Sequence, residues 1–275
     1  MKNMAQAVKL NTGDLMPAIG FGTWQLHEQE AYQAVLAAFK AGYRYIDTAR
    51  IYGNEAAVGR AARASGLPRS ELFITTKLWN DDNGYQQAHQ AFAASLRRLA
   101  LDYVDLYLIH WPFSDERLDS WQALTEIHQR GLAKAVGVSN YTIKHLEEVM
   151  VHSRLVPAVN QIELHPFIYA SQRQLLTFCR RHKIAVQAYS PLAHGRRMDN
   201  PLINEIAARH GKTPAQVMVR WCVQHGTVPI PKSTNPRRIA ENFTVFDFDL
   251  SPAEMRRLDD LSEGLHTTWD IDGID

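Results

Sequence analysis

Four residues of different chemical type stand in the first half of the sequence: a carboxylate, a phenol, an ammonium and an imidazole, at Asp47, Tyr52, Lys77 and His110. A buried lysine needs an acidic partner because an unpaired buried ammonium is costly, and Asp47 is suited to that role. A lysine near a tyrosine hydroxyl stabilises the phenolate, so we expect the pKa of Tyr52 to fall from about 10. Tyrosine then becomes a usable general acid near neutral pH, and histidine can orient a carbonyl oxygen through a hydrogen bond.

The elements that position these residues are eight short apolar runs, spaced fairly evenly along the chain. Nearly every run ends at a polar or ionisable residue. In chain order these are Asp47, Lys77, His110, Ser139-Asn140, Gln161, Tyr189-Ser190 and Lys232-Ser233. Amphipathic helical patterns alternate with the runs, which favours a parallel sheet. We therefore predict an α/β fold, a (β/α)8 TIM barrel, in which the ends of all eight strands meet on one face.

The barrel pattern occupies one predicted domain, 1–275, and both ends of the chain add to it. A turn at 11–14 between Val8-Leu10 and Leu15-Met16 predicts an N-terminal β-hairpin. The tail from Leu265 to Asp275, which contains Trp269, lacks periodicity. It is either a flexible end or a C-terminal loop near the barrel mouth, and our fold prediction adopts the loop.

Helix boundaries are marked most clearly at three places. A helical repeat that includes Phe39 stops at Gly42, a common C-terminal signal. Thr213-Pro214-Ala215-Gln216 and Ser251-Pro252-Ala253-Glu254 each fit a capping box with proline at the first helical position.

Composition excludes several classes of partner. The net charge of +1 over 275 residues gives no general attraction to nucleic acid or acidic membranes. No apolar stretch reaches the roughly 20 residues that cross a bilayer, and 1–15 lacks the apolar core of a secretory signal. Cys179 and Cys222 are expected as two reduced core thiols rather than a disulfide, which suits a reducing compartment. We expect a soluble cytoplasmic protein with no metal site.

Structural interpretations compete for each residue taken alone. An Asp–Lys pair is usually structural, a loop tyrosine usually packs, and His110 before Trp111-Pro112 could be a satisfied core histidine. Four such residues at successive strand ends are much harder to explain by packing, so the combination favours a functional site.

Three motifs, in consistent order between Leu15 and about Leu250, resemble those of the aldo-keto reductases. They are Asp47-Thr48-Ala49-Arg50-Ile51-Tyr52-Gly53-Asn54-Glu55, then Leu101 through Asp105 to His110-Trp111-Pro112, then Ile230-Pro231-Lys232-Ser233 with Arg238 and Glu241-Asn242. Within the family the chain is most similar to bacterial 2,5-diketo-D-gluconate reductase-like enzymes. The resemblance implies an NADPH-dependent reductase of small aldehydes and ketones, such as keto sugars, diketones or methylglyoxal-like aldehydes. It also implies that Asp47, Tyr52, Lys77 and His110 are catalytic, that Tyr52 donates the proton, and that the enzyme is a monomer.

The cofactor cannot bind through a Rossmann turn, because no G-x-G-x-x-G follows a strand. The basic segment after the last strand stands where barrels often bind phosphate, although such a segment alone is usually a solvated turn. The resemblance implies that Lys232, Ser233, Thr234 and Arg238 hold the 2′-phosphate of NADPH, with Glu241 and Asn242 beside the adenine. At the nicotinamide end it implies Ser139, Asn140 and Gln161 at the carboxamide, Tyr189 stacked on the ring, and Ser190 to Leu192 along the pyrophosphate. Gly22 and Thr23, after the first strand, complete the predicted cofactor set.

Three tryptophans, Trp24, Trp79 and Trp111, follow the first, third and fourth predicted strands. Buried tryptophan is usually core, but three at one rim suggest the walls of a substrate pocket that also contains His110. The sequence departs from the commoner bacterial pattern at Ala193-His194-Gly195, where a glutamine usually replaces the histidine.

Two other functions remain open. A Schiff-base aldolase would use Lys77 or Lys232 as its nucleophile, but it leaves the other strand-end residues and the basic last loop unexplained. A non-catalytic NADPH-binding barrel would explain the loop but not why all four catalytic residue types are present.

Overall fold

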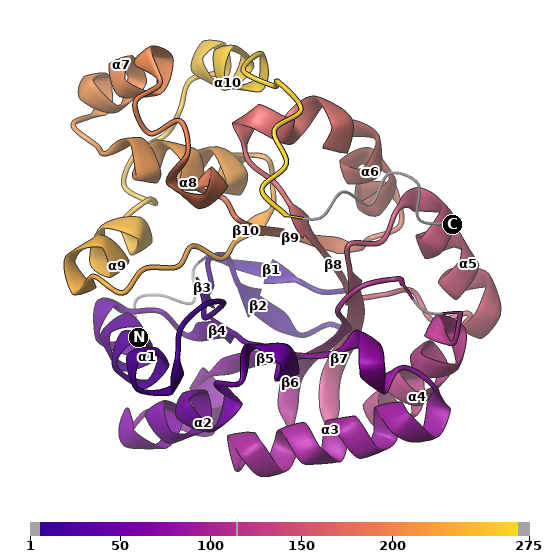
Figure 1. The fold of residues 1–275 in the computed structure, drawn as a ribbon. Helices are drawn as coiled ribbons and strands as arrows, with labels where there is room; N and C mark the ends of the chain where they lie inside the picture. The colour runs from indigo at the N-terminus through magenta and orange to yellow at the C-terminus, as the bar shows by residue number, and fades with distance from the viewer. Residues whose placement is uncertain (1–5, 114, 269–275) are drawn as a thin grey trace.

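Eight parallel strands form the centre of the fold in a computed structural model that describes residues 6–113 and 115–268 (Figure 1). Each strand pairs with the next one along the chain. They are β3 (Phe21–Gly22), β4 (Tyr45–Asp47), β5 (Phe73–Leu78), β6 (Val104–Ile109), β7 (Ala133–Ser139), β8 (Val159–Glu163), β9 (Ala185–Tyr189) and β10 (Val228–Pro229). The predicted barrel is confirmed.

Two backbone hydrogen bonds join the first and last strands and so close the sheet. The N–H groups of Gly20 and Gly22 donate to the carbonyl oxygens of Pro229 and Pro231, at 2.9 and 3.1 Å. A side chain at Gly22 would place its Cβ 2.9 Å from the Ile230 carbonyl oxygen, so this approach requires glycine. Because Pro229 and Pro231 have no N–H to donate in return, these two bonds run in one direction only, from the glycines to the prolines.

Helices surround the strands, as Figure 1 shows. They are α1 (Glu28–Ala41), α2 (Glu55–Ala64), α3 (Tyr85–Leu99), α4 (Arg117–Gln129), α5 (Ile143–Ser153), α6 (Tyr169–Arg181), α7 (Pro201–His210), α8 (Pro214–Gln224), α9 (Pro236–Phe243) and α10 (Pro252–Asp259). Helix α7 packs on α8, and α10 packs on α7, outside the ring. Both predicted capping boxes form, at Thr213 and Ser251, and Gly42 ends α1 with a φ of 113°. Among the described residues no helix has the length and apolar character needed to cross a membrane.

The N-terminal hairpin consists of β1 (Ala7–Lys9) and β2 (Leu15–Pro17), which pair antiparallel as predicted. Met16 is fully buried, and its sulfur accepts a hydrogen bond from Gln187 of β9 at 3.0 Å. The hairpin therefore places the Met16 side chain in the barrel interior, against Gln187.

The two cysteines lie on α6 and α8, and both are free and buried, as predicted. Burial raises the pKa of the Cys179 thiol to about 12, so it stays protonated at neutral pH. Both thiols are therefore unreactive parts of the core.

Candidate active site

The structure brings together the four residues that the sequence singled out. Asp47 ends β4, Lys77 lies in β5, His110 follows β6, and Tyr52 ends the short helix Arg50–Tyr52. The Lys77 Nζ lies 2.5 Å from Asp47 Oδ1 and 3.5 Å from the Tyr52 hydroxyl oxygen. The rings of Tyr52 and His110 meet edge to face with their centroids 5.7 Å apart. A phenol and an imidazole thus stand side by side next to a buried ion pair.

The Asp47 carboxylate is fixed by bonds from both sides. Its Oδ1 accepts from Lys77, and its Oδ2 accepts from Gln161 Nε2 at 2.9 Å and from the Tyr45 hydroxyl at 3.4 Å. Gln161 lies inside β8 rather than at its end, and the same Nε2 donates to Gln187 Oε1 at 2.7 Å. The predicted nicotinamide residue Gln161 therefore also anchors the Asp47 carboxylate from within the barrel.

Burial determines the protonation of the group. It lowers the pKa of Lys77, an effect that Asp47 opposes. It also lowers the pKa of His110 well below its usual value, and Lys77 adds to this, so the imidazole is neutral. Burial, with Asp47 and Tyr189 adding to it, raises the pKa of Tyr52 well above its usual value. The prediction of a lowered tyrosine pKa is therefore wrong for this structure, because desolvation of the phenol outweighs an ammonium 3.5 Å away.

His110 carries a buried ring nitrogen, Nδ1, with no hydrogen-bond partner in the part of the chain that the structure describes. Buried polar atoms are almost always paired, so this nitrogen is unusual. The edges of the Tyr52 and Trp79 rings surround the imidazole, with centroids 5.7 and 5.2 Å from its own. The imidazole is thus held in place by rings.

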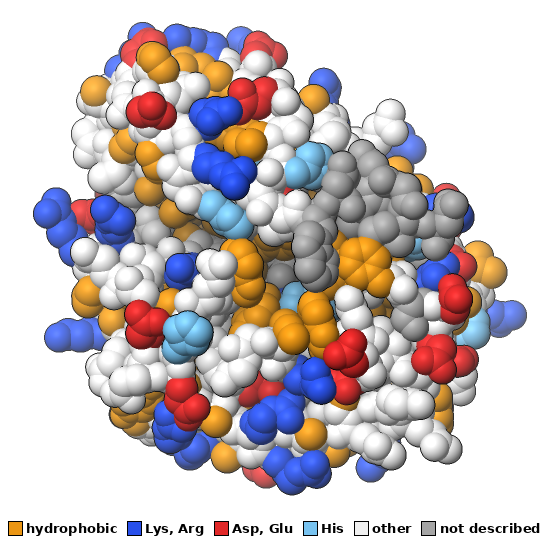
Figure 2. Space-filling view, in the orientation of Figure 1, with side chains coloured by type: hydrophobic (Ala, Val, Ile, Leu, Met, Phe, Trp, Pro, Cys, Tyr) orange, Lys and Arg blue, Asp and Glu red, His pale blue; other side chains and the backbone are white. Residues whose placement is uncertain are grey.

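A single cavity of about 1160 Å³ opens at this face of the barrel and connects nearly all the predicted site residues. Figure 2 shows its mouth as a hollow bordered by hydrophobic side chains. Its lining includes Gly22, Trp24, Asp47, Tyr52, Trp79, His110, Trp111, Ser139, Asn140, Gln161, Tyr189, Ser190, Leu192, Lys232, Ser233, Arg238, Glu241 and Asn242. Three predicted site residues, Thr23, Lys77 and Thr234, are not part of that lining. Thr23 is fully buried and donates to the Asp47 carbonyl oxygen at 2.9 Å, so it supports the site from behind.

The middle of the cavity is built by residues that hold one another. Asn140 donates from Nδ2 to the His110 carbonyl oxygen at 3.0 Å and to Ser139 Oγ at 3.1 Å. The Tyr189 hydroxyl lies 2.8 Å from Asn140 Oδ1. Ser139 donates in turn to the Gln161 carbonyl oxygen at 2.9 Å. This end of the cavity presents amide and hydroxyl groups next to His110.

The other end of the cavity is cationic. Lys232 and Arg238 line it, and neither forms an ion pair within 6–113 and 115–268. Asn235 caps α9, where its side chain accepts from the backbone N–H groups of Arg237 and Arg238 at 2.9 and 3.3 Å. Two unpaired cations beside hydroxyl groups suit a phosphate dianion.

Several lining residues were missed by the sequence reasoning. They are Gln25, Ile51, Met198, the start of α8 at 213–215, and Thr267 and Thr268 of the tail. The tail thus reaches the barrel mouth, as the predicted loop requires, while Trp269 lies outside the described residues. No periodicity or charge pattern marks these residues in the sequence. Only the position of the tail after the last helix could have suggested them.

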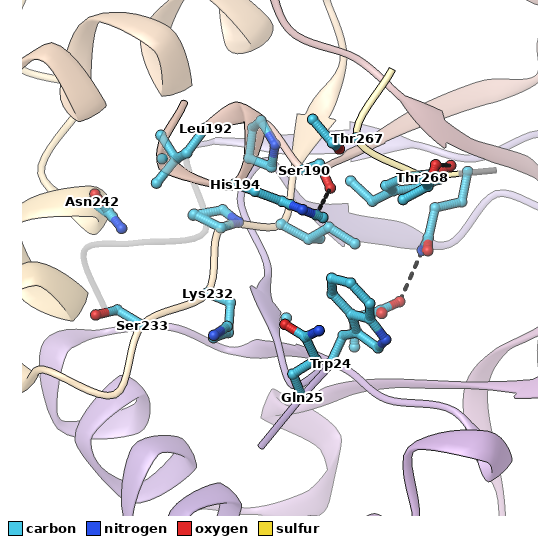
Figure 3. A pocket seen from close by; sticks show the side chains of 18 of the residues that line it. Trp24, Gln25, Ser190, Leu192, His194, Lys232, Ser233, Asn242, Thr267 and Thr268 are labelled. Atoms are coloured by element: carbon cyan, nitrogen blue, oxygen red, sulfur yellow. Dashed lines mark hydrogen bonds between the residues drawn. The ribbon is translucent and has the colours of Figure 1, made fainter. Parts of the chain in front are cut away.

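A contact crosses the cavity between its two predicted halves. The rings of Trp24 and His194 lie 5.1 Å apart, and His194 Nε2 lies 2.9 Å from Ser190 Oγ (Figure 3). The segment also carries positive φ angles at Ser190, Ala193, His194 and Arg197. Left-handed conformations of non-glycine residues are costly and cluster at functional sites. His194, which departs from the usual glutamine, thus helps to cover the cavity.

A barrel that gathers ionisable groups at the C-terminal ends of its strands has the architecture of a barrel enzyme. The family model of the Aldo/keto reductase family matches residues 18–263, and the chain belongs to that family. It is therefore an oxidoreductase.

Known proteins resemble the chain over nearly its whole length. An aldo-keto reductase of Mycolicibacterium vanbaalenii is 51% identical over 94% of this chain and 92% of its own. The glyoxal reductase of Bacillus subtilis is 46% identical over 95% and 94%. The structure of an aldo-keto reductase of Bombyx mori in complex with NADP is 36% identical, with a TM-score of 0.90, over 98% of this chain and 96% of that one.

Proposed function

We propose that the protein reduces the carbonyl group of small aldehydes and ketones with NADPH and that Tyr52 is the proton donor. The observation that carries this proposal is the pairing of Tyr52 with the buried Lys77–Asp47 ion pair, next to His110, at one end of a cavity whose other end is cationic. The relative named glyoxal reductase supports a small carbonyl substrate.

The residues of this chain each have a task in that reaction. A reduced nicotinamide, when bound, supplies the hydride that adds to the carbonyl carbon. The neutral His110 holds the carbonyl oxygen through a hydrogen bond, and Tyr52 transfers its proton to that oxygen, which completes the alcohol. The raised pKa of Tyr52 keeps the proton on the phenol until negative charge develops nearby. Lys77, held by Asp47, then stabilises the phenolate that remains.

The cavity fits NADPH at both ends. Lys232, Ser233 and Arg238 would hold the 2′-phosphate, and Glu241 and Asn242 would lie beside the adenine. Thr234, the fourth predicted phosphate residue, follows Ser233 in the chain but does not line the cavity. At the other end the amide and hydroxyl groups of Ser139, Asn140 and Gln161 match a carboxamide, beside Tyr189. Gly22, with Ser190 and Leu192, lines the path between the two ends, while Thr23 acts through its bond to Asp47. The NADP complex of the Bombyx mori relative supports this choice of cofactor.

Substrate would enter between Trp24, Trp79 and Trp111, which line the cavity around His110. Trp24 is 40% exposed and Trp111 only 7%, so the aromatic wall runs from the rim to the interior. We keep keto sugars, diketones and methylglyoxal-like aldehydes as candidate substrates. A single domain, a monomer and a cytoplasmic location also stay predictions, the last supported by the two free buried thiols.

The Schiff-base alternative is disfavoured by the surroundings of Lys77. Its Nζ is fully buried and donates to Asp47, to the Thr48 carbonyl oxygen at 3.0 Å and to Tyr52. Three donated hydrogen bonds use all the protons of the ammonium, and the residue does not line the cavity. A lysine nucleophile must instead reach its substrate as the free amine.

The variant Tyr52→Phe tests the proposal directly. Turnover should fall about 10²- to 10⁴-fold, the usual contribution of a general acid, in an NADPH-oxidation assay over aldehydes, diketones and sugar acids. NADPH should still bind, as measured by fluorescence titration. Tyr32→Phe on the outer helix α1 is the matched control and should keep full activity. Unchanged turnover in Tyr52→Phe would refute the role of Tyr52, and borohydride trapping of a carbonyl substrate on a lysine would favour the aldolase.

A further inference from the structure

Glu163, at the end of β8, is a buried carboxylate that the proposed reaction does not use. It is 4% exposed, and His165 Nε2 lies 3.0 Å from its Oε1. The same oxygen accepts from the backbone N–H of Thr267 at 2.9 Å and from the Thr267 hydroxyl, and Oε2 accepts from the Thr268 hydroxyl at 3.1 Å. Burial raises the pKa of Glu163, but the bonds of His165 and Thr267 outweigh it and hold the pKa at about 2. Glu163 is therefore ionised, and most of its partners belong to the C-terminal segment.

This segment, residues 262–268, lies against the barrel mouth. Figure 1 shows it in yellow, running from α10 towards the ends of β8 and β9. The N–H groups of Glu263 and Leu265 donate to the Phe167 carbonyl oxygen at 2.9 and 3.1 Å. Glu263 also pairs with Arg197 at 2.9 Å. These contacts hold the first part of the segment on the barrel, and the Glu163 carboxylate binds Thr267 and Thr268.

Thr268 connects Glu163 to the amide and hydroxyl groups beside His110. Its Oγ1 lies 2.9 Å from the Tyr189 hydroxyl, which lies 2.8 Å from Asn140 Oδ1. Asn140 in turn donates to the His110 carbonyl oxygen. In Figure 3, Thr267 and Thr268 lie on the opposite side of the cavity from Ser233 and Asn242. The segment thus adjoins the end of the cavity proposed for the nicotinamide.

Counting protons gives this chain of contacts a direction. An ionised carboxylate only accepts, so the Thr268 hydroxyl directs its single proton to Glu163. Its lone pairs then face Tyr189, whose hydroxyl keeps its proton because burial raises the pKa of the phenol. That single proton is donated either to Thr268 Oγ1 or to Asn140 Oδ1, one at a time. The charge of Glu163 therefore orients the Thr268 hydroxyl, which leaves Thr268 Oγ1 as an acceptor beside Tyr189.

We propose that Glu163 is a positioning residue, which fixes the C-terminal segment on the barrel mouth and, through Thr268, holds Tyr189 and Asn140 in place for the nicotinamide. The second half of this statement rests on the proposed function, since it requires a nicotinamide beside Tyr189. The first half depends only on the contacts of Glu163 with Thr267 and Thr268.

Hydrogen exchange, measured by mass spectrometry on the ligand-free protein, tests the anchoring. The peptide that covers residues 262–268 should be protected in the wild type and exchange at least tenfold faster in Glu163→Ala. Glu163→Gln, which keeps one acceptor oxygen, should restore part of the protection. Glu28→Ala is the control, because Glu28 is an exposed carboxylate that pairs with Arg60 on the outer helices. Equal exchange in the wild type and Glu163→Ala would overturn the anchor.

A matched pair of threonine variants tests the positioning. In the structure the Thr267 hydroxyl donates to Glu163, whereas the Thr268 hydroxyl contacts both Glu163 and Tyr189. Thr268→Val should weaken NADPH binding about tenfold, the scale of one lost hydrogen bond to a charged network. Thr267→Val should change it less than twofold. Binding of adenosine 2′,5′-bisphosphate, which has no nicotinamide, should stay the same in both.

The outcomes separate the two proposals. Equal affinities of both threonine variants for NADPH, or an equal loss for NADPH and the bisphosphate in Thr268→Val, would overturn the positioning role of Glu163. If the wild type binds NADPH no better than the bisphosphate, the proposed function fails. The exchange experiment still decides the anchor in that case, because it uses no cofactor.

Discussion

Replacing Asp47 with asparagine should reveal how strongly the buried ion pair is coupled to the stability of the barrel. Lys77 is fully buried and Asp47 is 2% exposed, with 2.5 Å between Nζ and Oδ1. Asparagine keeps the size of the side chain but removes the charge, which leaves a buried ammonium without its counter-ion. Breaking a buried pair in this way typically costs about 3–5 kcal/mol.

The pKa of Lys77 gives a second estimate of this loss of stability, which is similar in size and depends on pH. In Asp47→Asn, burial still lowers the pKa of Lys77, and the charge that opposed burial is gone. If the Lys77 amine is neutral in the folded variant, folding must remove the proton that the unfolded lysine carries. At pH 7 this removal takes place about 3.4 pH units below the ordinary lysine pKa of about 10.4. At about 1.36 kcal/mol per unit this costs about 4.6 kcal/mol. The unfolded state then binds the extra proton, so the stability of the variant should rise with pH between 7 and 10.

Urea unfolding, followed by circular dichroism at pH 7 and pH 9.5, measures both effects. Asp47→Asn should lose about 3–5 kcal/mol at pH 7 and recover about 3 kcal/mol of the difference from the wild type at pH 9.5. The double variant Asp47→Asn/Lys77→Met has no buried ammonium, so its stability should exceed that of the single variant at pH 7 and lack this pH dependence. A loss below about 1 kcal/mol would refute the reasoning, since it would mean that Lys77 is not desolvated. The same loss at both pH values would refute the pH dependence, since it would mean that Lys77 keeps its proton in the folded variant.

Three further predictions concern other parts of the molecule. Gly59→Ala should destabilise the protein by about 1–3 kcal/mol in urea unfolding, because its Cβ would lie 1.9 Å from the Leu99 carbonyl oxygen at the end of α3. Lys232→Gln should raise the KM for NADPH about 10- to 100-fold and leave that for NADH nearly unchanged, the scale of a lost charge-assisted bond; equal effects on both cofactors would contradict a phosphate contact. In the folded protein the pKa of Glu163 is about 2, which is below its ordinary value of about 4.3. Glu163 therefore contributes stability that is present above about pH 4.3 and is lost as the pH falls towards 2. Acid unfolding of Glu163→Gln should lack that part of the pH dependence.

The sequence predicted those parts of the fold and site that depend on local pattern. Asp47, Lys77 and His110 were placed at strand ends by apolar runs, and a barrel brings strand ends together whatever the details of packing. The caps at Thr213 and Ser251 follow from a four-residue pattern and were also confirmed. The closure of the sheet is different, because Gly22 bonds to Pro231, which lies more than 200 residues away in the sequence.

The parts that could not be predicted depend on burial and on contacts between distant residues. The pKa of Tyr52 rises because the folded chain desolvates the phenol, which no spacing in the sequence measures. Gln161 was expected to face the cofactor, but its amide nitrogen is also bonded to Asp47, which lies 114 residues away. Thr267 and Thr268 have no pattern of their own, and only the partner Glu163, 104 and 105 residues earlier, gives them a role.

The two ends of the cavity are built by different physical means, and this difference predicts how the protein divides chemistry from binding. Asp47 and Lys77 lie on neighbouring strands of a closed sheet, so their separation changes only if the barrel itself deforms. Lys232 and Arg238 lie on a loop and on the first turn of α9, where exposed side chains keep their freedom until a ligand orders them. The Trp24–His194 contact joins the loops after β3 and β9. Substitutions in these loops should therefore change the affinity for the cofactor and the rate of its release. Substitutions at the strand ends should instead change the rate of the chemical step.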